Sequence, residues 1–461
     1  MMIKNYQELF ANLPTTETAK SRKTILELLE IGIAAVLPQN LIPNAVSTED
    51  GKIRIKALQL TLSEIQNIYV IGAGKASGGM AEALEHILQT RITQGVINIP
   101  EGTRDRYQVK IIELNEARHP IPSESGVIGA KRIIEICNKA QEHDLIIVLL
   151  SGGGSALLPF PADSISLNEF QKLNDALIKS GATIHEINTV RKHCSKIKGG
   201  QLAKAGYPAT IITLILSDVI GNPIYDIASG PTVPDPSTFN DAAKILKHYH
   251  LWNSLHPSIR KHLENGRQGI ISETPKPSDN IFNKTHTFII GDLNLACKAI
   301  LDAAVAKGLH SEIISTTVRG EAREVGRYIL QMALGTPPHS NNGIKMRKVL
   351  IFGGEPTVTV KGTGKGGRCQ EVGLSILSQL KKQTRFTFAA LGTDGIDGYT
   401  DAAGVIIDGS SYKKMKSIVL SPLFYLNNND SYNFFKKLGA SLIFTDYTGT
   451  NVNDLMLFGL F

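Results

Sequence analysis

Three glycine-rich turns have residue types and spacings that suit the binding of an anionic ligand. The first spans residues 70–79 (VIGAGKASGG), after an apolar segment and before a stretch of helical pattern. In that setting, backbone N–H groups and the helix dipole face the anion. We expect Gly72, Gly74 and Lys75 to bind phosphate, with a tight turn and an exposed lysine as the plainer alternative.

The same turn does not complete either of two common nucleotide-binding motifs. Tyr69 stands where the GxxxxGK[ST] loop begins with glycine, and Ala76 follows the lysine where that loop has Ser or Thr. Ser77 occupies the third glycine position of the dinucleotide-binding fingerprint. Taken alone, the turn predicts an anion site and does not identify a nucleotide.

The second turn follows the apolar run that ends at Leu150. Successive glycines between two serines let backbone amides approach a ligand with no side chain in the way, and the hydroxyls add donors. A flexible loop is the alternative. The residues predicted to bind phosphate or substrate here are Ser151, Gly152, Gly153, Gly154 and Ser155.

The third turn leads from GGEPT (353–357) through GTGKGGRCQE (362–371), where a helical pattern starts. A guanidinium at a helix N-terminus is well placed to bind a phosphate or carboxylate through two hydrogen bonds. A hairpin loop with surface charges is the alternative. The predicted binding residues here are Glu355, Gly364, Gly366, Gly367 and Arg368.

Aspartates follow two further strand-like segments, at Asp218 and in GTDGIDG (392–398). Phosphoryl transfer uses Mg²⁺ to bridge phosphate oxygens and often a carboxylate to accept the hydroxyl proton. Asp218, Asp394 and Asp397 are therefore predicted metal ligands, with a purely structural role in turns as the alternative. Asp218 and Asp394 are also predicted catalytic groups, together with Lys75 and Arg368, which would stabilise charge on the transferring phosphoryl group.

A basic segment, NTVRKHCSKIKGG (188–200), ends a helical stretch. Its cations either neutralise an anionic substrate or cap a helix C-terminus, where positive charge is favoured. Both interpretations stay open at this point. Arg191 and Lys198 are the substrate-binding candidates.

Strand-like and helix-like segments alternate along the first half of the chain and place these turns at strand ends. This alternation predicts an α/β fold with a doubly wound parallel sheet, whose ligands bind at the carboxyl ends of the strands. A helix is expected at 22–37. The expected strands are 67–72, 144–151 and 209–217, and the expected helices between them are 78–89, 124–141 and 167–181.

A break in the pattern divides the chain into two expected domains. Residues 221–240 are rich in proline, aspartate and glycine, and a second alternation starts with the strand-like segment 286–291 and the helix-like segment 292–308. A loop is expected at 336–343. We place the boundary near residue 240, giving domains 1–240 and 241–461.

Composition excludes several classes of protein. The chain has 49 Lys+Arg and 42 Asp+Glu, a modest excess without the basic, aromatic-rich stripe of a nucleic-acid binder. No apolar run approaches the ~20 residues that cross a bilayer, so we expect no membrane role. The 4 cysteines form no CxxC pair, which favours a reducing cytoplasm. We expect a monomer or homodimer with a small-molecule substrate.

Taken in order, the motifs resemble the glycerate 2-kinase family, whose C-terminal half is often called the MOFRL domain. The resemblance covers nearly the whole chain, and several segments are long enough that chance agreement is negligible. The segments that carry it include GAGKASGGMAEAL, LSGGGSALL, LSDVIGNPIYDIASGPTVPDPSTF, GGEPTVTVKGTGKGGRCQE, GTDGIDGYTDAAG and TGTNVND.

The resemblance implies two Rossmann-like α/β domains with parallel or mixed sheets and an active site in the cleft between them. It also implies ATP- and Mg²⁺-dependent phosphorylation of D-glycerate at the 2-hydroxyl. The family's important lysine and arginine fall on Lys75 and Arg368. Cys369 and Asn222 depart from the family's usual Asn and Asp, which leaves their ligand contacts open.

Two other functions remain as alternatives. The near-GxGxxG turn is compatible with an NAD(P)-dependent hydroxypyruvate reductase. A catalytically silent sugar-acid-binding regulator is the third. Neither explains the third glycine-rich turn and the GTDGIDG segment, so the kinase is the favoured prediction.

Overall fold

The chain forms two α/β units in this computed structural model, which describes residues 2–11, 13–335, 347–381 and 385–461. The central unit is Pro38–Ile290, and the terminal unit combines Met1–Leu37 with Gly291–Phe461. The loop expected at 336–343 lies outside the described residues.

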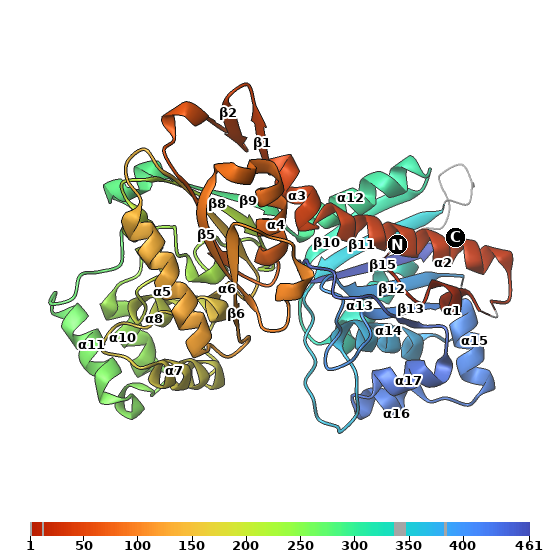
Figure 1. Cartoon of the computed structure of the whole chain (residues 1–461). Helices are drawn as coiled ribbons and strands as arrows, with labels where there is room; N and C mark the ends of the chain where they lie inside the picture. Colours follow the sequence, from red (N-terminus) through yellow and green to blue (C-terminus); the bar gives the residue numbers. More distant parts are fainter. Residues whose placement is uncertain (1, 12, 336–346, 382–384) are drawn as a thin grey trace. The chain divides into compact units, whose positions relative to one another are not determined.

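The central unit is built on a six-stranded sheet with the order β6-β5-β4-β7-β8-β9 (Figure 1). The pairings from β6 through β8 are all parallel. This is the strand order of a Rossmann fold, in which the order reverses between the first and fourth strands, here β4 and β7. The strands are β4 (Ile68–Ala73), β5 (Ile92–Pro100), β6 (Ile112–Ala117), β7 (Leu145–Ser151), β8 (Thr210–Leu216) and β9 (Thr285–Gly291).

Four of these strands, β4, β7, β8 and β9, were predicted, and burial on both faces explains the first three. Every residue of β4 and β7 is buried, so both are almost wholly apolar. The sequences of β5 and β6 mix polar residues and glycine with apolar ones, and neither strand was predicted. The main helices of this unit are α4 (Ser77–Leu88), α5 (Glu124–Lys139), α7 (Leu167–Lys179), α8 (Ile184–His193), α9 (Gln201–Gly206), α10 (Phe239–His248) and α11 (Pro257–Arg267).

The terminal unit contains a mixed six-stranded sheet with the order β10-β11-β15-β12-β13-β14. The β10–β11 pairing is parallel and the other four pairings are antiparallel. The α/β class with parallel or mixed sheets is therefore confirmed. The strands are β10 (His310–Val318), β11 (Lys348–Gly354), β12 (Thr387–Gly392), β13 (Gly404–Asp408), β14 (Leu442–Ile443) and β15 (Asp454–Leu460).

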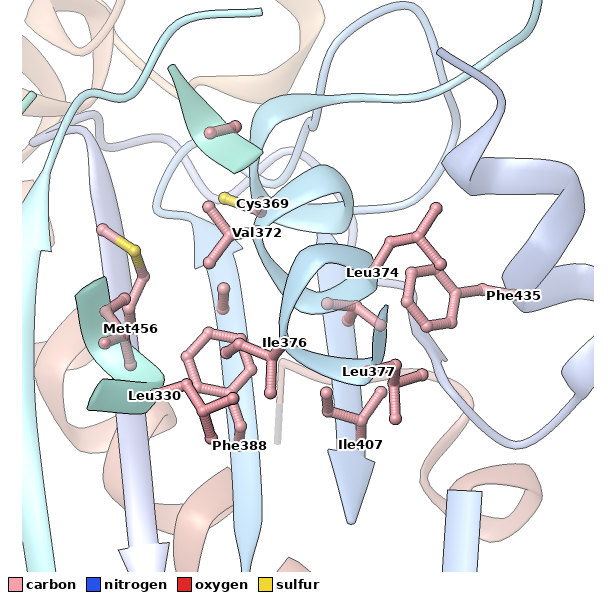
Figure 2. Packing of buried hydrophobic residues seen from close by; sticks show 14 of the residues in the cluster. Leu330, Cys369, Val372, Leu374, Ile376, Leu377, Phe388, Ile407, Phe435 and Met456 are labelled. Carbon is pink, nitrogen blue, oxygen red and sulfur yellow. The ribbon is translucent and has the colours of Figure 1, made fainter. Parts of the chain in front are cut away.

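Helix α14 (Arg368–Gln379) is the best-buried helix of the terminal unit. Its side chains Val372 and Ile376 pack in one cluster with Phe388 of β12 and Met456 of β15 (Figure 2). Tight packing on the sheet fixes the helix axis, and with it the position of its first residue, Arg368. The other helices are α2 (Thr16–Ala35), α12 (Leu293–Ala306), α13 (Ala322–Gly335), α15 (Gly409–Ser417), α16 (Pro422–Asn427), α17 (Ser431–Leu438) and the short α1 (Tyr6–Phe10).

The boundary expected near residue 240 differs from this division at both ends of the central unit. Helices α10 and α11 share a hydrophobic cluster with α7 and α8, and β9 joins the central sheet. Helix α2 packs against α12 and against strands β12 and β15. The segment 221–240, with its loop-like composition, is a loop within the central unit and not a boundary between units. The sequence misplaced the boundary because local composition does not reveal which core a later helix joins.

The ends of the central unit carry smaller elements. Helix α3 (Pro38–Ala45) leads into a three-stranded antiparallel sheet of β1 (Val46–Glu49), β2 (Lys52–Ile55) and β3 (Leu58–Thr61). Among the described residues, no single helix has the length and apolar composition to cross a bilayer, and α2 with α3 meets that test only as a bent pair.

Candidate active site

The turns that follow β4 and β7 lie against each other at the reversal of strand order. Lys75 N–H donates to the Gly152 carbonyl oxygen at 2.8 Å, and Ala76 N–H donates to Ser151 Oγ at 2.9 Å. A Cβ on Gly74 would lie 2.1 Å from Ser151 Oγ, so only glycine fits. Ligands of doubly wound sheets bind at this point of the sheet.

Gly72 has a different position from the other predicted glycines. It lies inside β4, where a Cβ would be 2.0 Å from the Leu149 carbonyl oxygen of β7. The lack of a side chain therefore lets the two strands approach. Nothing in this geometry points Gly72 at a ligand, and its predicted phosphate contact stays a prediction.

A pocket of about 600 Å³ opens beside these turns and is lined by Ser151 through Ser155. Arg191, Lys198 and Asp218 also line it, so residues from three separate segments meet in one place. The Asp218 carboxylate lies directly on the loop backbone, since a Cβ on Gly152 would be 2.0 Å from Asp218 Oδ2.

Two cations of this pocket are strongly desolvated. Lys198 is 1% exposed and donates from Nζ to the Ser155 carbonyl oxygen at 2.9 Å and to Ser155 Oγ at 3.1 Å. Burial, with the charge of Arg191, lowers the pKa of Lys198 to about 7. Burial lowers the pKa of Arg191 to about 10. The pocket thus holds positive charge at a high desolvation cost.

His119 is a pocket residue to which the sequence pattern assigned no role. Its ring lies over the loop, because a Cβ on Gly153 would be 2.9 Å from His119 Nε2 and 3.4 Å from Lys75 Cγ. Burial and the nearby Lys75 charge lower the pKa of His119 to about 4. The imidazole is therefore neutral near pH 7 and adds no charge to the pocket.

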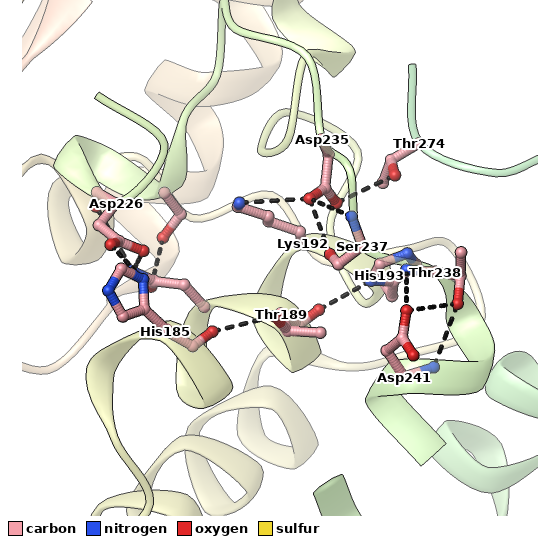
Figure 3. A network of polar contacts seen from close by, with 12 residues as sticks. His185, Thr189, Lys192, His193, Asp226, Asp235, Ser237, Thr238, Asp241 and Thr274 are labelled. Carbon is pink, nitrogen blue, oxygen red and sulfur yellow. Dashed lines mark hydrogen bonds and ion pairs between the residues drawn. The ribbon is translucent and has the colours of Figure 1, made fainter. Parts of the chain in front are cut away.

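A hydrogen-bond chain runs from Ser155 to Asp226, and the exposed His185 lies beside its far end. Ser155 Oγ lies 2.9 Å from Ser229 Oγ, Ser229 donates to Asn188 Oδ1 at 2.9 Å, and Asn188 donates to Asp226 Oδ1 at 3.0 Å. Asp226 Oδ2 is 2.6 Å from Nδ1 of His185, at the start of α8 (Figure 3). Of these residues only Ser155 was predicted from the sequence as a site residue, since the others lie far from it in the sequence and complete no general motif.

In the terminal unit, Arg368 contacts two carboxylates. Its Nε and Nη2 lie 2.7 and 3.0 Å from the two oxygens of Asp454, and its Nη1 donates to Glu355 Oε1 at 2.8 Å. Asp454 is 1% exposed, whereas the Glu355 side chain is 47% exposed. Burial and the charge of Asp397 raise the pKa of Asp454 to about 7, against the opposing effect of Arg368.

Asp454 was not among the predicted site residues. It is the last residue of the TGTNVND segment and the first of β15. The segment itself was the available signal, because it is one of those that carry the family resemblance. A carboxylate there had no visible partner until the fold brought Arg368 to it.

Asp397 anchors the first turn of α14. Its two oxygens accept the backbone N–H groups of Cys369 at 3.0 Å and Gln370 at 2.9 Å. Burial raises the pKa of Asp397 to about 6, against these hydrogen bonds. Asp397 thereby caps the N-terminus of α14 from another segment and fixes the helix turn that carries Arg368. Its predicted metal contact stays a prediction.

The glycines of the third turn allow a close approach to the segment Asn428–Ser431. Gly364 N–H donates to the Asn428 carbonyl oxygen at 2.9 Å. A Cβ on Gly364 would be 2.3 Å from Asp430 Cβ, and one on Gly366 would be 2.2 Å from Ser431 Oγ. Packing alone accounts for these glycines, together with Gly367, whose Cβ would be 2.3 Å from Asp397 Cγ.

The predicted metal ligands divide between the units. Asp218 lies in the central pocket, and Asp394, which accepts the Ile396 N–H at 3.2 Å, lies in the terminal unit with Asp397. Across the described ranges, no group of three or more His, Cys, Asp or Glu side chains is arranged to hold a metal. Magnesium usually takes only one or two carboxylates and completes its coordination with substrate phosphates and water.

The sheet order and the cationic pocket at its reversal define a class: Rossmann-type α/β proteins that bind a small anionic ligand. Two family models match the chain, one described as a domain of unknown function, DUF4147, over residues 24–264, and the MOFRL family over residues 348–454. A protein of Pyrococcus horikoshii named glycerate 2-kinase is 41% identical over 95% of this chain and 96% of its own. The chain belongs to the glycerate 2-kinase family.

Two further relatives bear on the fold and on the alternative function. A crystal structure of glycerate kinase from Thermotoga maritima superposes with a TM-score of 0.82, with 38% identity over 95% of this chain and 99% of that chain. A protein of Agrobacterium vitis, 39% identical over 84% of this chain and 85% of its own, is provisionally named a hydroxypyruvate reductase.

Proposed function

We propose that this protein is a glycerate 2-kinase that transfers the γ-phosphoryl group of ATP to the 2-hydroxyl of D-glycerate in the presence of Mg²⁺. The observation that carries the proposal is the pocket at the β4–β7 reversal, where an open glycine backbone, the cations Arg191 and Lys198 and the carboxylate of Asp218 converge. Membership of the glycerate 2-kinase family supports it.

The residues present fit a nucleotide with magnesium. Gly152, Gly153 and Gly154 present backbone without side chains at the pocket, as a phosphate cradle requires. Asp218 and Asp394 offer the carboxylate oxygens that magnesium prefers. When bound, ATP would supply the phosphoryl group and Mg²⁺ would neutralise part of its charge.

The chain's own residues would work mainly by positioning and by electrostatics. Lys75 and Arg368 stabilise negative charge on the transferring group, and Asp218 accepts the proton of the substrate hydroxyl. Asp454 and Asp397 act one step away, since one holds the Arg368 guanidinium and the other holds the helix turn that carries it.

Phosphorus NMR of the products tests the proposal directly. Incubation with ATP, Mg²⁺ and D-glycerate is expected to yield 2-phosphoglycerate and ADP, and 3-phosphoglycerate or no transfer would contradict it. Lys75→Ala is expected to abolish turnover, because the loop loses the charge beside the phosphate. Lys298→Ala is the matched control, since that exposed lysine pairs with Asp302 on the surface of α12.

The hydroxypyruvate reductase alternative has one observation in its favour, the Rossmann strand order of the central unit. It predicts that D-glycerate reduces NAD⁺ or NADP⁺ in the absence of ATP. Absorbance of the reduced nicotinamide measures this reaction in the same preparation. Reduction without ATP, together with no phosphorylated product, would replace the kinase by the reductase.

We also propose a cytoplasmic enzyme that acts as a monomer or homodimer. The cysteines Cys137, Cys194, Cys297 and Cys369 are all free and buried, which supports a reducing compartment. Light scattering of the purified protein tests the oligomeric state. Fractionation of cells that express it tests the compartment.

A further inference from the structure

Two cations in the central pocket, the buried Lys198 and the partly buried Arg191, have only neutral hydrogen-bond partners among the described residues. Lys198 donates to the carbonyl and hydroxyl oxygens of Ser155, and Arg191 donates from Nε to Asn174 Oδ1 at 2.5 Å. In the part of the chain that the structure describes, neither cation lies within ion-pair distance of a carboxylate. Positive charge there is left without compensation.

The other lysines of the same segment do not share this property. Lys192, on α8, is buried and lies 3.3 Å from Asp235, which also accepts from Thr274 and Ser237 (Figure 3). Lys196 is partly exposed and pairs with Asp163 at 2.7 Å. Positive charge along 188–200 is thus compensated everywhere except at the pocket.

An uncompensated buried cation costs free energy, and an anionic ligand removes that cost. Burial already lowers the pKa of both groups, most strongly for Lys198, as the Arg191 charge adds to the effect. The neutral partners Ser155 and Asn174 orient the two side chains without neutralising them. The arrangement therefore favours an anion over a neutral ligand.

The surroundings favour a singly charged carboxylate. Asp175, Asp218 and Asp226 also line the pocket, so a second negative charge beside Arg191 and Lys198, without the magnesium that accompanies nucleotide phosphates, would meet like charges. A carboxylate brings one negative charge and matches the planar guanidinium fork. A hydroxyl on the adjacent carbon is a donor, which a carboxylate such as Asp218 accepts.

We propose that Arg191 and Lys198 form the subsite for the carboxylate of a small 2-hydroxy acid substrate. This assignment rests on the proposed function for the identity of that acid, and it goes beyond it by separating the acid's subsite from the phosphates of the nucleotide. Arg191 and Lys198 are then specificity-determining residues that discriminate charged from uncharged acceptors.

Steady-state kinetics of Arg191→Met and Lys198→Met test the assignment. The KM for D-glycerate is expected to rise by about 10- to 100-fold in each, as a charge-assisted hydrogen bond is lost, with the KM for ATP nearly unchanged. Arg191→Lys keeps a cation and is expected to lie between wild type and Arg191→Met. Lys196→Met is the matched control, expected to behave as wild type.

The uncharged amide glyceramide tests whether the subsite requires a negative charge on the acceptor. In wild type, the inhibition constant of glyceramide is expected to exceed the KM for D-glycerate by at least about 100-fold. The Met variants are expected to lose most of this difference. Equal competition in wild type would overturn the proposal, whether or not the variants fold. A rise in the KM for ATP alone would also overturn it and assign the two cations to phosphate.

Calorimetric titration of D-glycerate into the nucleotide-free protein separates failure of this inference from failure of the proposed function. Binding by wild type that both Met variants lose, without any phosphorylated product, would uphold the subsite and reject the kinase. Phosphorylated product with unchanged D-glycerate binding in both variants would uphold the kinase and reject the subsite.

Discussion

In the terminal unit Arg368 meets two carboxylates, whereas in the central unit Arg191 and Lys198 donate only to neutral groups. Compensation fixes Arg368 in place before any ligand arrives, since Asp454 contacts both Nε and Nη2. Among the described residues, no carboxylate lies within ion-pair distance of Arg191 or Lys198, which leaves their charge for a ligand to satisfy. The comparison indicates that the charge of a cation's partners, more than its burial, shows whether the cation is already neutralised by the protein or can bind an anionic ligand.

Removal of the compensated cation is expected to have the largest effect. Arg368→Ala takes away the guanidinium and leaves Asp454 buried beside Asp397 without a positive neighbour. We expect kcat to fall by about 10³-fold, the range found for arginines that stabilise transferring phosphoryl groups. A coupled assay of ADP release measures it, and a kcat within tenfold of wild type would remove Arg368 from the catalytic groups.

Removal of the buried partner tests whether Asp454 positions Arg368. Asp454→Asn keeps the shape of the side chain but removes the charge that holds Nε and Nη2 of Arg368. We therefore expect kcat to fall by about 100-fold with little change in either KM. Thermal unfolding monitors the fold. A rise in KM at constant kcat would show that the carboxylate does not hold Arg368 for the chemical step.

The uncompensated lysine is expected to make stability depend on pH. The pKa of Lys198 falls from 10.5 in its ordinary state to about 7 in the fold, so above pH 7 the unfolded chain binds more protons than the folded one. The free energy of unfolding then rises as pH rises from about 7 toward 10.5.

Urea unfolding of wild type and Lys198→Met at two pH values measures this dependence. We expect wild type to gain about 2 kcal/mol relative to the variant between about pH 7 and pH 9, from the shift of the lysine alone. Parallel pH curves for the two proteins would show that Lys198 keeps its charge in the fold.

The exposed partner of Arg368 is expected to matter least. Glu355→Gln removes an ion pair whose carboxylate is 47% exposed, and such pairs contribute about 0–1 kcal/mol. We expect changes in kcat and KM of no more than about fivefold. A loss as large as that of Asp454→Asn would make the two carboxylates equivalent and remove the distinction drawn between them.

Sequence reasoning located the strand-end turns because their signals are local. Apolar runs at 67–72 and 144–151 became β4 and β7, and Arg368 begins α14 as expected. The two interpretations of Arg191 and Lys198 could not be separated at that stage. Helix C-terminal cations and pocket cations look alike until their partners are known.

The sequence by itself determined the α/β class, the family and the turns that carry Lys75, Ser151 and Arg368, since periodicity and motif order are properties of short segments. Only the tertiary structure decided that α10, α11 and β9 belong to the central unit, and that Asp454 holds Arg368. It also decided that Arg191 and Lys198 have neutral partners. The physical reason is that burial and charge compensation depend on residues far apart in the chain, which no local pattern records.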